Sequence, residues 1–287
     1  MGKRLDIRKT YKLYIDGKFP RTESGRYYKW TDPKGGQVLN ICRGSRKDFR
    51  DAVVAARRAF APWEGRTAYN RGQIIYRIAE MLEGRRDQFE VELTLQGATR
   101  KEARREVENT IDRLIYYAGW ADKYQQVFSS VNPVAMPYFD FTVHEATGVV
   151  AVIAPETSSL WGLVSLLAPV VVGGNTCVVL ASNSHPLCAI TFAEVLQTSD
   201  LSPGVVNMIT GMRSELLEHF ASHMDVNAIV YCGENADEIK MVGEKSSLNV
   251  KRVVTLTDSG WNRKTAQGPY HILKTQEIKT TWHPVGI

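Results

Sequence analysis

Five short apolar runs, spaced through the second half of the chain, constrain the fold more than any other feature. They occupy residues 149–153, 176–180, 205–209, 228–231 and 253–256. Each run is rich in β-branched residues and almost continuously hydrophobic, which is typical of strands buried on both faces of a parallel sheet. The runs alternate with helical patterns near 160–172, 186–198, 213–222 and 235–246. This alternation predicts an α/β fold with a doubly wound, five-stranded parallel sheet.

The residues that precede the sheet predict an N-terminal layer of helices. Ser45 is a plausible N-cap for an apolar stripe that ends at Trp63. A second stripe lies between Ile74 and Leu82, and a third lies on a charged helix that we expect to reach about Gln126. A hairpin-like turn is expected at residues 14–17.

Composition and charge exclude several classes of protein. The 287 residues are 44% hydrophobic and 23% charged, which is close to the globular average and argues against long disorder. Lysine and arginine exceed aspartate and glutamate by 36 to 31, a charge of +5 that is too dilute for a nucleic-acid-binding surface. The four cysteines have no CxxC spacing, which indicates reduced thiols and no zinc site. No apolar run is long enough to cross a bilayer, so we expect a cytoplasmic protein with neither a membrane nor a nucleic-acid partner.

Two segments do not fit inside the predicted sheet. Residues 133–146 alternate between apolar and polar like a two-sided strand, and residues 270–287 have β-branched character after a Gly-Pro break. A strand at a chain end must add to a sheet edge, in its own chain or in another. We therefore expect a small β arm that takes part in oligomerisation.

Several stretches occur in an order that is specific to one family. They are YIDGKF, YYAGWADK at 116–123, FTVHEATGVVAVIAP, APVVVGGNTCVVL, LSPGVVNMITG at 201–211 and HMDVNAIVYCG at 223–233. In these stretches the chain resembles the NAD(P)-dependent aldehyde dehydrogenases over nearly its whole length. The resemblance implies three parts. Residues 1–258 would form a cofactor-domain-like α/β domain that includes the arm strand 133–146. Residues 259–269 would be a junction that replaces the catalytic domain, and 270–287 the C-terminal oligomerisation strand. Because the tail ends like a family C-terminus and the chain starts with Met1, we expect a natural chain rather than a cloned fragment.

The resemblance also implies that the catalytic groups of the family are missing. The nucleophilic cysteine of the family belongs to the absent domain. The oxyanion-stabilising asparagine aligns with Thr157, and the tryptophan before it aligns with Glu156. The general-base glutamate aligns with Thr257, which cannot take a proton from water at neutral pH. We therefore expect no catalytic residue in this chain.

The cofactor positions depart from the family pattern in the same direction. The lysine that holds the adenine ribose is Ala181, and the turn that contacts the pyrophosphate reads YCGE at 231–234. Its second glycine aligns with Glu238. Carboxylates here would repel phosphate from a helix N-terminus, so we expect no cofactor, with NAD(P) binding weak at best. The degenerate positions are Glu156, Thr157, Ala181, Gly233, Glu234 and Glu238.

Other chemically suggestive residues have simpler interpretations. Cys232 is expected to be a small buried thiol, because no histidine or basic residue lies within five positions of it. His219 and His223 lie four residues apart near Asp225, a spacing compatible with a metal site, but the glutamate of an HEXXH motif is missing. The remaining candidates are expected to be core aromatics (Tyr116, Tyr117, Trp120) or solvated helix faces (Arg85, Arg86, Arg104 and Arg105 beside Glu83, Glu102 and Glu106).

Two classes of function remain. The first is a non-catalytic structural or regulatory subunit that assembles with itself or with a full-length aldehyde dehydrogenase. The second is an enzyme, either an NAD(P)-dependent oxidoreductase acting on aldehydes with residual or partner-supplied activity, or a nucleotide-binding hydrolase with an unrecognised site. The first is favoured because packing motifs are retained while the positions with a chemical role have changed.

Overall fold

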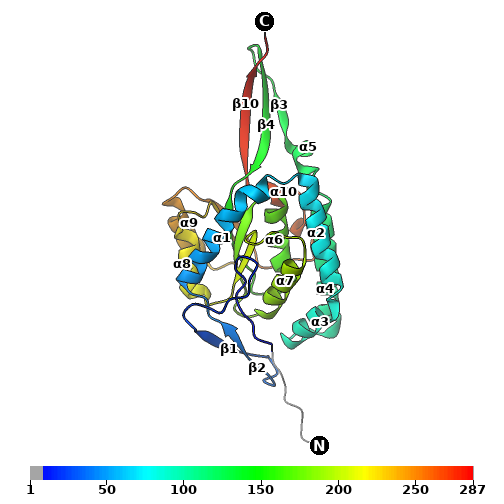
Figure 1. Ribbon diagram of the computed structural model, residues 1–287, viewed down its shortest axis with the longest axis vertical. Coiled ribbons are helices and arrows are strands. Elements are labelled where there is room, and N and C mark those ends of the chain that lie inside the picture. Colours follow the sequence, from blue (N-terminus) through cyan, green and yellow to red (C-terminus); the bar gives the residue numbers. More distant parts are fainter. Residues whose placement is uncertain (1–8, 287) are drawn as a thin grey trace, which may run out of the picture.

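A five-stranded parallel sheet lies between two layers of helices in the computed structural model, which describes residues 9–286 (Figure 1). In chain order its strands are β5 (Val149–Ile153), β6 (Thr176–Leu180), β7 (Val206–Ile209), β8 (Ala228–Cys232) and β9 (Arg252–Leu256). The spatial order is β7-β6-β5-β8-β9 with every pair parallel. The predicted fold class is therefore confirmed, and each strand boundary lies within one residue of its predicted position. The order reverses between β5 and β8, so a ligand crevice is expected at the carboxyl ends of these two strands.

The helices fall into two groups along the chain. Those before the sheet are α1 (Arg46–Glu64), α2 (Ala68–Glu83), α3 (Arg86–Leu95), α4 (Arg100–Ala118) and α5 (Tyr124–Phe128). Those between its strands are α6 (Trp161–Val172), α7 (Leu187–Thr198), α8 (Arg213–Ser222) and α9 (Ala236–Ser247). Ser45 caps α1 as predicted, in a capping box with Asp48. The charged helix expected to reach Gln126 ends at Ala118 instead, because Gly119 disfavours helix and tight turns follow it before α5.

Alternate residues along each central strand face two separate hydrophobic cores. Val149, Ala151 and Ile153 pack with residues of α1 and α8. Val150 and Val152 pack with the opposite helices, α6 and α7, and with α2 to α4. Figure 1 shows the same division, with α1, α8 and α9 on one side of the molecule and α2, α4, α6 and α7 on the other. Burial on both faces explains why the strand sequences are continuously apolar.

Two smaller antiparallel sheets lie outside the central sheet. One joins β1 (Tyr27–Thr31) to β2 (Val38–Cys42), and the other is an arm of β3 (Ser130–Asn132), β4 (Tyr138–Ala146) and β10 (Gln276–Pro284). In Figure 1 the arm projects from the end of the molecule opposite β1 and β2. A 3-10 turn (Lys264–Ala266) and a short helix, α10 (Tyr270–Leu273), precede β10.

The arm differs in detail from the prediction. The strand expected over 133–146 begins only at Tyr138, as β4. Residues 133–137 form the turn of a hairpin between β3 and β4, because this turn contains Pro133 and Pro137 and proline has no N–H for a strand ladder. The C-terminal strand begins at Gln276, after α10. The predicted turn at 14–17 is present, since Ile15 bridges to Lys18.

Within residues 9–286, no helix combines the length and apolar character needed to cross a membrane. Residues 1–8, at the start of the predicted domain, and residue 287, at the end of the predicted tail, lie outside the described residues.

Candidate functional site

The loop that follows β5 lies at the switch point of the sheet, and its backbone N–H groups are bonded to a carboxylate of the chain itself. Asp258 Oδ2 accepts from the amides of Glu156, at 2.6 Å, and Thr157, at 3.1 Å. The Thr157 hydroxyl donates to Asp258 Oδ1 at 2.5 Å. Asp258 comes two residues after β9, which pairs with β8 and so ends near this loop. Both amides and the hydroxyl are therefore occupied.

The Glu156 side chain makes a second contact of this kind, with the loop after β6. Its carboxylate accepts from Ser182 Oγ at 2.8 Å, Asn183 N at 3.1 Å and Ser184 N at 2.9 Å. Burial acts to raise the pKa of Glu156, but these hydrogen bonds and the nearby Arg213 outweigh burial and hold that pKa below its ordinary value. Glu156 is therefore an ionised, fixed link between the two loops.

A third carboxylate, that of Glu106 on α4, reaches the N-terminus of α6. Its Oε1 accepts from Ser158 Oγ at 2.9 Å, Leu160 N at 3.0 Å and Trp161 N at 3.1 Å. The N-cap residue of α6 is Leu160, which has no side-chain oxygen, so Glu106 supplies the cap from a different helix.

The expectation of a solvated helix face was therefore wrong for Glu106, because packing of α4 against α6 brings its carboxylate inward. The expectation of a solvated helix face is confirmed for two of the arginines. Arg86 pairs with Glu83 at 2.9 Å, and Arg104 pairs with Glu108 at 2.9 Å on the surface of α4.

Arg213, at the first position of α8, lies among the carboxylates of the crevice. Its guanidinium donates to the carbonyl oxygens of Ala154, at 2.7 Å, and Cys232, at 3.4 Å. It also lies 3.8 Å from a carboxylate oxygen of Glu156 and 3.6 Å from one of Glu238. With Asp258 included, carboxylates outnumber the guanidinium in this group, so the group carries net negative charge.

Glu238 also accepts a hydrogen bond from the hydroxyl of Tyr231, at 2.6 Å. Burial and then this hydrogen bond raise the pKa of Tyr231, so its hydroxyl stays protonated and remains a donor. The N-terminus of α9 is capped separately, because Asn235 Oδ1 accepts from the amides of Asp237 and Glu238.

The structure brings some of the predicted positions together and leaves others apart. Glu156, Thr157 and Glu238 share the network around Arg213 and Asp258. Ala181 is buried after β6, where its N–H donates to the carbonyl of Ile209, and Glu234 is exposed. The N–H of Gly233 donates to the carbonyl of Leu256, which ties β8 to β9.

Cys232 and Thr257 lie near each other, but their contact is not one of a nucleophile with a base. The Cys232 thiol is buried and donates to the carbonyl oxygen of Thr257, at 3.7 Å. Burial is the main cause that raises the pKa of Cys232, to about 12. The thiol is therefore protonated at neutral pH, which agrees with the prediction of a small buried thiol.

Three members of this network were missed by sequence reasoning, namely Glu106, Arg213 and Asp258. Arg213 begins a predicted helix and Asp258 follows a predicted strand. Both positions therefore lie at the carboxyl edge of the predicted sheet, and this placement could have identified them as candidate site residues. Glu106 had no such signal, since only the packing of two helices brings it to the N-terminus of α6.

The predicted aromatic cluster belongs to the core. Tyr117 is fully buried, and Tyr116 packs edge-on against it with the ring centres 5.2 Å apart. Trp120 lies against Tyr116 at 6.3 Å. This arrangement confirms core packing for the cluster.

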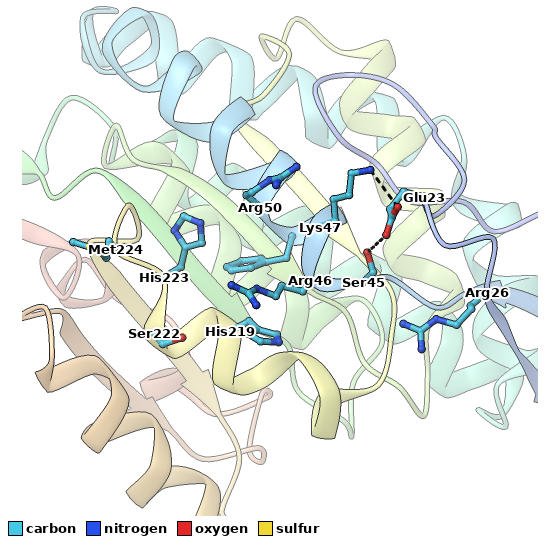
Figure 2. Close-up of a pocket in the computed structure, with 11 residues that line it drawn as sticks. Glu23, Arg26, Ser45, Arg46, Lys47, Arg50, His219, Ser222, His223 and Met224 are labelled. Atoms are coloured by element: carbon cyan, nitrogen blue, oxygen red, sulfur yellow. Dashed lines mark hydrogen bonds and ion pairs between the residues drawn. The ribbon is translucent and has the colours of Figure 1, made fainter.

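His219 and His223 line a separate cavity of about 750 Å³ between the start of α1 and the second half of α8 (Figure 2). Arginine and lysine side chains surround the two histidines there. Nowhere in residues 9–286 do three or more His, Cys, Asp or Glu side chains gather in a way that could hold a metal ion. None of the residues that line this cavity belongs to the network around Arg213.

Comparisons with known proteins agree with the fold. Residues 20–260 match the model of the aldehyde dehydrogenase family. Omega-crystallin of Enteroctopus dofleini is 30% identical over 248 residues, which cover 84% of this chain and 49% of that protein. Retinal dehydrogenase 2 of Mus musculus is 31% identical over 256 residues, which cover 87% of this chain and 48% of that protein.

Solved structures give the same result. HpcC from Thermus thermophilus superposes with a TM-score of 0.82 and 28% identity, over 86% of this chain and 48% of that one. The NAD+ complex of the aldehyde dehydrogenase from Bacillus cereus superposes with a TM-score of 0.82 and 25% identity, over 87% of this chain and 51% of that one. The chain spans about half the length of the relatives it matches. By its matching family model and by its fold, the chain belongs to the aldehyde dehydrogenase family.

Proposed function

We propose that this protein is a non-catalytic member of the family, a structural or regulatory subunit that assembles with itself or with a full-length aldehyde dehydrogenase. One observation carries the proposal. Six backbone N–H groups at the switch-point crevice are bonded to the chain's own carboxylates, those of Glu106, Glu156 and Asp258. A crevice filled in this way offers few donors to a ligand.

The residues around the crevice do not fit a dinucleotide. A pyrophosphate binds where helix N-terminal N–H groups are free, and at α6 these groups already serve Glu106. The excess of carboxylates around Arg213 repels a second set of negative charges. Ala181 offers no ammonium group to a ribose. We therefore assign no NAD(P)-dependent step to this chain.

The positions aligned with catalytic groups support the same conclusion. The Thr157 hydroxyl already donates to Asp258, so it is not a free donor to an oxyanion. Thr257 is not a general base, and the Cys232 thiol is kept protonated by burial.

The arm supports the assembly part of the proposal. One of its faces carries a row of apolar side chains, Val131, Phe139, Phe141 and Val143. On the other face Ile278 is 65% exposed and Trp282 is 56% exposed. Among the described residues β10 pairs only with β4, which leaves its outer edge open over nine residues. An unpaired edge strand with exposed apolar side chains is a site of association, so we propose that a partner subunit covers this arm.

The junction proposed for residues 259–269 is an ordered part of the molecule. Arg113, which is buried in α4, donates to the carbonyl oxygens of Ala266, at 2.7 Å, and Trp261, at 3.2 Å. It also donates to Ser165 Oγ at 2.5 Å. This anchoring is consistent with the proposed division of the chain into a cofactor-domain-like part (1–258), a junction (259–269) and a C-terminal oligomerisation segment (270–287) that contains β10. The four cysteines are unpaired, which supports a reducing compartment, and we place the protein in the cytoplasm.

Calorimetric titration with NAD and NADP tests the non-catalytic proposal. We expect no binding in the micromolar range and no formation of NADH or NADPH with a panel of aldehydes. Micromolar binding together with turnover would instead establish the alternative, an NAD(P)-dependent oxidoreductase that acts on aldehydes.

Light scattering of the purified chain tests the assembly proposal. The double variant Phe139→Ser, Trp282→Ser should lower the mass of the assembly, because each change removes an exposed aromatic ring from the arm. Tyr69→Ser on α2 is the matched control, since Tyr69 is 66% exposed and lies outside the arm. An unchanged mass in the arm variant would contradict the proposal, and co-purification with a full-length aldehyde dehydrogenase would distinguish mixed assembly from self-assembly.

A further inference from the structure

The cavity between α1 and α8 carries a surplus of positive charge. Its cationic lining consists of Arg26, Arg46, Lys47 and Arg50, with His219 and His223 beside them (Figure 2). Glu23 is the one carboxylate in the lining, and it pairs with Lys47 at 3.2 Å, as the dashed line in Figure 2 marks. The lining therefore carries a net charge of about +3 when both histidines are neutral.

The arginines of the cavity are poorly compensated. Within residues 9–286 the Arg46 side chain has neither a hydrogen bond nor an ion pair, and the Arg26 side chain bonds only to Ser24 Oγ, at 3.3 Å. Arg50 pairs with Asp51 at 3.0 Å, but both side chains are at least half exposed, and such a pair contributes little. The guanidinium groups are thus available to a ligand.

The capping box of α1 uses two of the amides at the start of this helix. Ser45 Oγ accepts from Asp48 N at 3.2 Å, and Asp48 Oδ2 accepts from Ser45 N at 2.8 Å. The full positive charges of the lining are those of its side chains. The side chain of Met224, which is 84% exposed, also lines the cavity, so the cavity has an apolar wall beside its cations.

We propose that this cavity binds a small organic phosphate that carries more than one phosphate group. Guanidinium groups match phosphate oxygens with paired hydrogen bonds, and the arginines come from two elements, α1 and the loop before β1. Cations spread in this way suit several anionic groups better than one. The volume, about 750 Å³, lies in the range of small-molecule sites, and the apolar wall suits the organic part.

His223 provides a readout of binding. Burial lowers the pKa of His223, Asp225 opposes that shift, and Lys251 and Arg46 add to it. His219 and Arg50 line the same cavity. A bound phosphate adds negative charge beside the imidazole, so it raises the pKa of His223 and binds more tightly as the pH falls.

Titration of the whole chain with pyrophosphate and with ADP, followed by calorimetry and by NMR of the histidine ring protons, tests the proposal. We expect saturable binding that weakens with salt and raises the pKa of His223. Arg46→Gln should weaken pyrophosphate binding about tenfold, the loss expected for one charge-assisted hydrogen bond. Its melting temperature should be unchanged, because Arg46 has no partner to lose. Arg77→Gln, which removes an exposed arginine paired with Glu80 on α2, is the matched control and should bind normally.

Three results would overturn the proposal. The first is the absence of saturable binding at millimolar pyrophosphate and ADP, or equal affinity in Arg46→Gln, Arg213→Met and the unchanged chain. The second is binding of a hexaglutamate peptide without binding of pyrophosphate, which would indicate a protein partner. The third is binding that survives Arg46→Gln and is lost in Arg213→Met. That result would place the phosphate in the switch-point crevice and would also count against the non-catalytic proposal, whereas the first two leave that proposal untouched.

Discussion

Replacing Arg213 with methionine should expose how much the filled crevice stabilises the fold. Methionine keeps the apolar stem of the side chain and removes the guanidinium. The Arg213 side chain is 17% exposed, and those of Glu156 and Glu238 are 28% and 27% exposed. The variant leaves both carboxylates without their cation and the carbonyl of Ala154 without its donor.

The magnitude follows from this partial burial. Removing one partner of a fully buried ion pair costs about 3–5 kcal/mol. Because the carboxylates are about one quarter exposed, and because Glu156 keeps three other donors, we expect about 2 kcal/mol here. A loss of that size lowers the melting temperature by roughly 4–8 °C in a chain of this length.

The pH dependence gives a second check on the same variant. The pKa of Glu156 is lower in the folded state than in the unfolded state. Its contribution to stability is therefore complete above the unfolded pKa, about 4.3, and is lost as the pH falls through the folded value. The difference between Arg213→Met and the unchanged chain should be full at pH 7 and should shrink below about pH 4.

Urea denaturation followed by tryptophan fluorescence measures this difference in the free energy of unfolding, once at pH 7 and once below about pH 4. Arg50→Met is the matched control, because its pair with Asp51 is exposed and contributes little. The reasoning is refuted if Arg213→Met stays within about 0.5 kcal/mol of the unchanged chain at pH 7, the range of ordinary surface substitutions. An equal loss at both pH values would refute the electrostatic part alone.

Four further substitutions test other parts of the structure. Lys251 is 8% exposed, and burial lowers its pKa to about 8, so Lys251→Met should raise stability in urea denaturation at pH 7. That gain should shrink between pH 8 and 10, where the folded lysine has already lost its proton and the unfolded one has not. Gly204 has a φ of +85°, and an added Cβ would lie 2.7 Å from the carbonyl oxygen of Ala55, so Gly204→Ala should cost about 2 kcal/mol or more in thermal melts. Gly243→Ala in α9, where nothing lies within 4 Å, should instead stabilise by about 0.5–1 kcal/mol. Arg113→Met should speed tryptic cleavage within 259–269, because the junction loses its two carbonyl anchors, and an unchanged cleavage rate would show that other contacts hold it.

The kinds of element and their order along the chain followed from local sequence pattern. A strand buried on both faces must be apolar at nearly every position, so the runs at 149–153 and 176–180 are recognisable without knowledge of their neighbours. Ser45 could be recognised as a cap for the same reason, because a capping box needs only residues within four positions. The resemblance to a family added the positions of Glu156, Thr157 and Glu238, but not what their side chains touch.

The contacts that fill the crevice required the folded chain. Glu106 bonds to the amide of Leu160, which lies 54 positions later, only because α4 packs against α6. Asp258 reaches the amide of Glu156 across 102 positions, because β9 lies two strands from β5 in the sheet. Local periodicity depends on which face of an element is buried, and it carries no information about which other element covers that face. The partners of these carboxylates were therefore determined by strand order and helix packing.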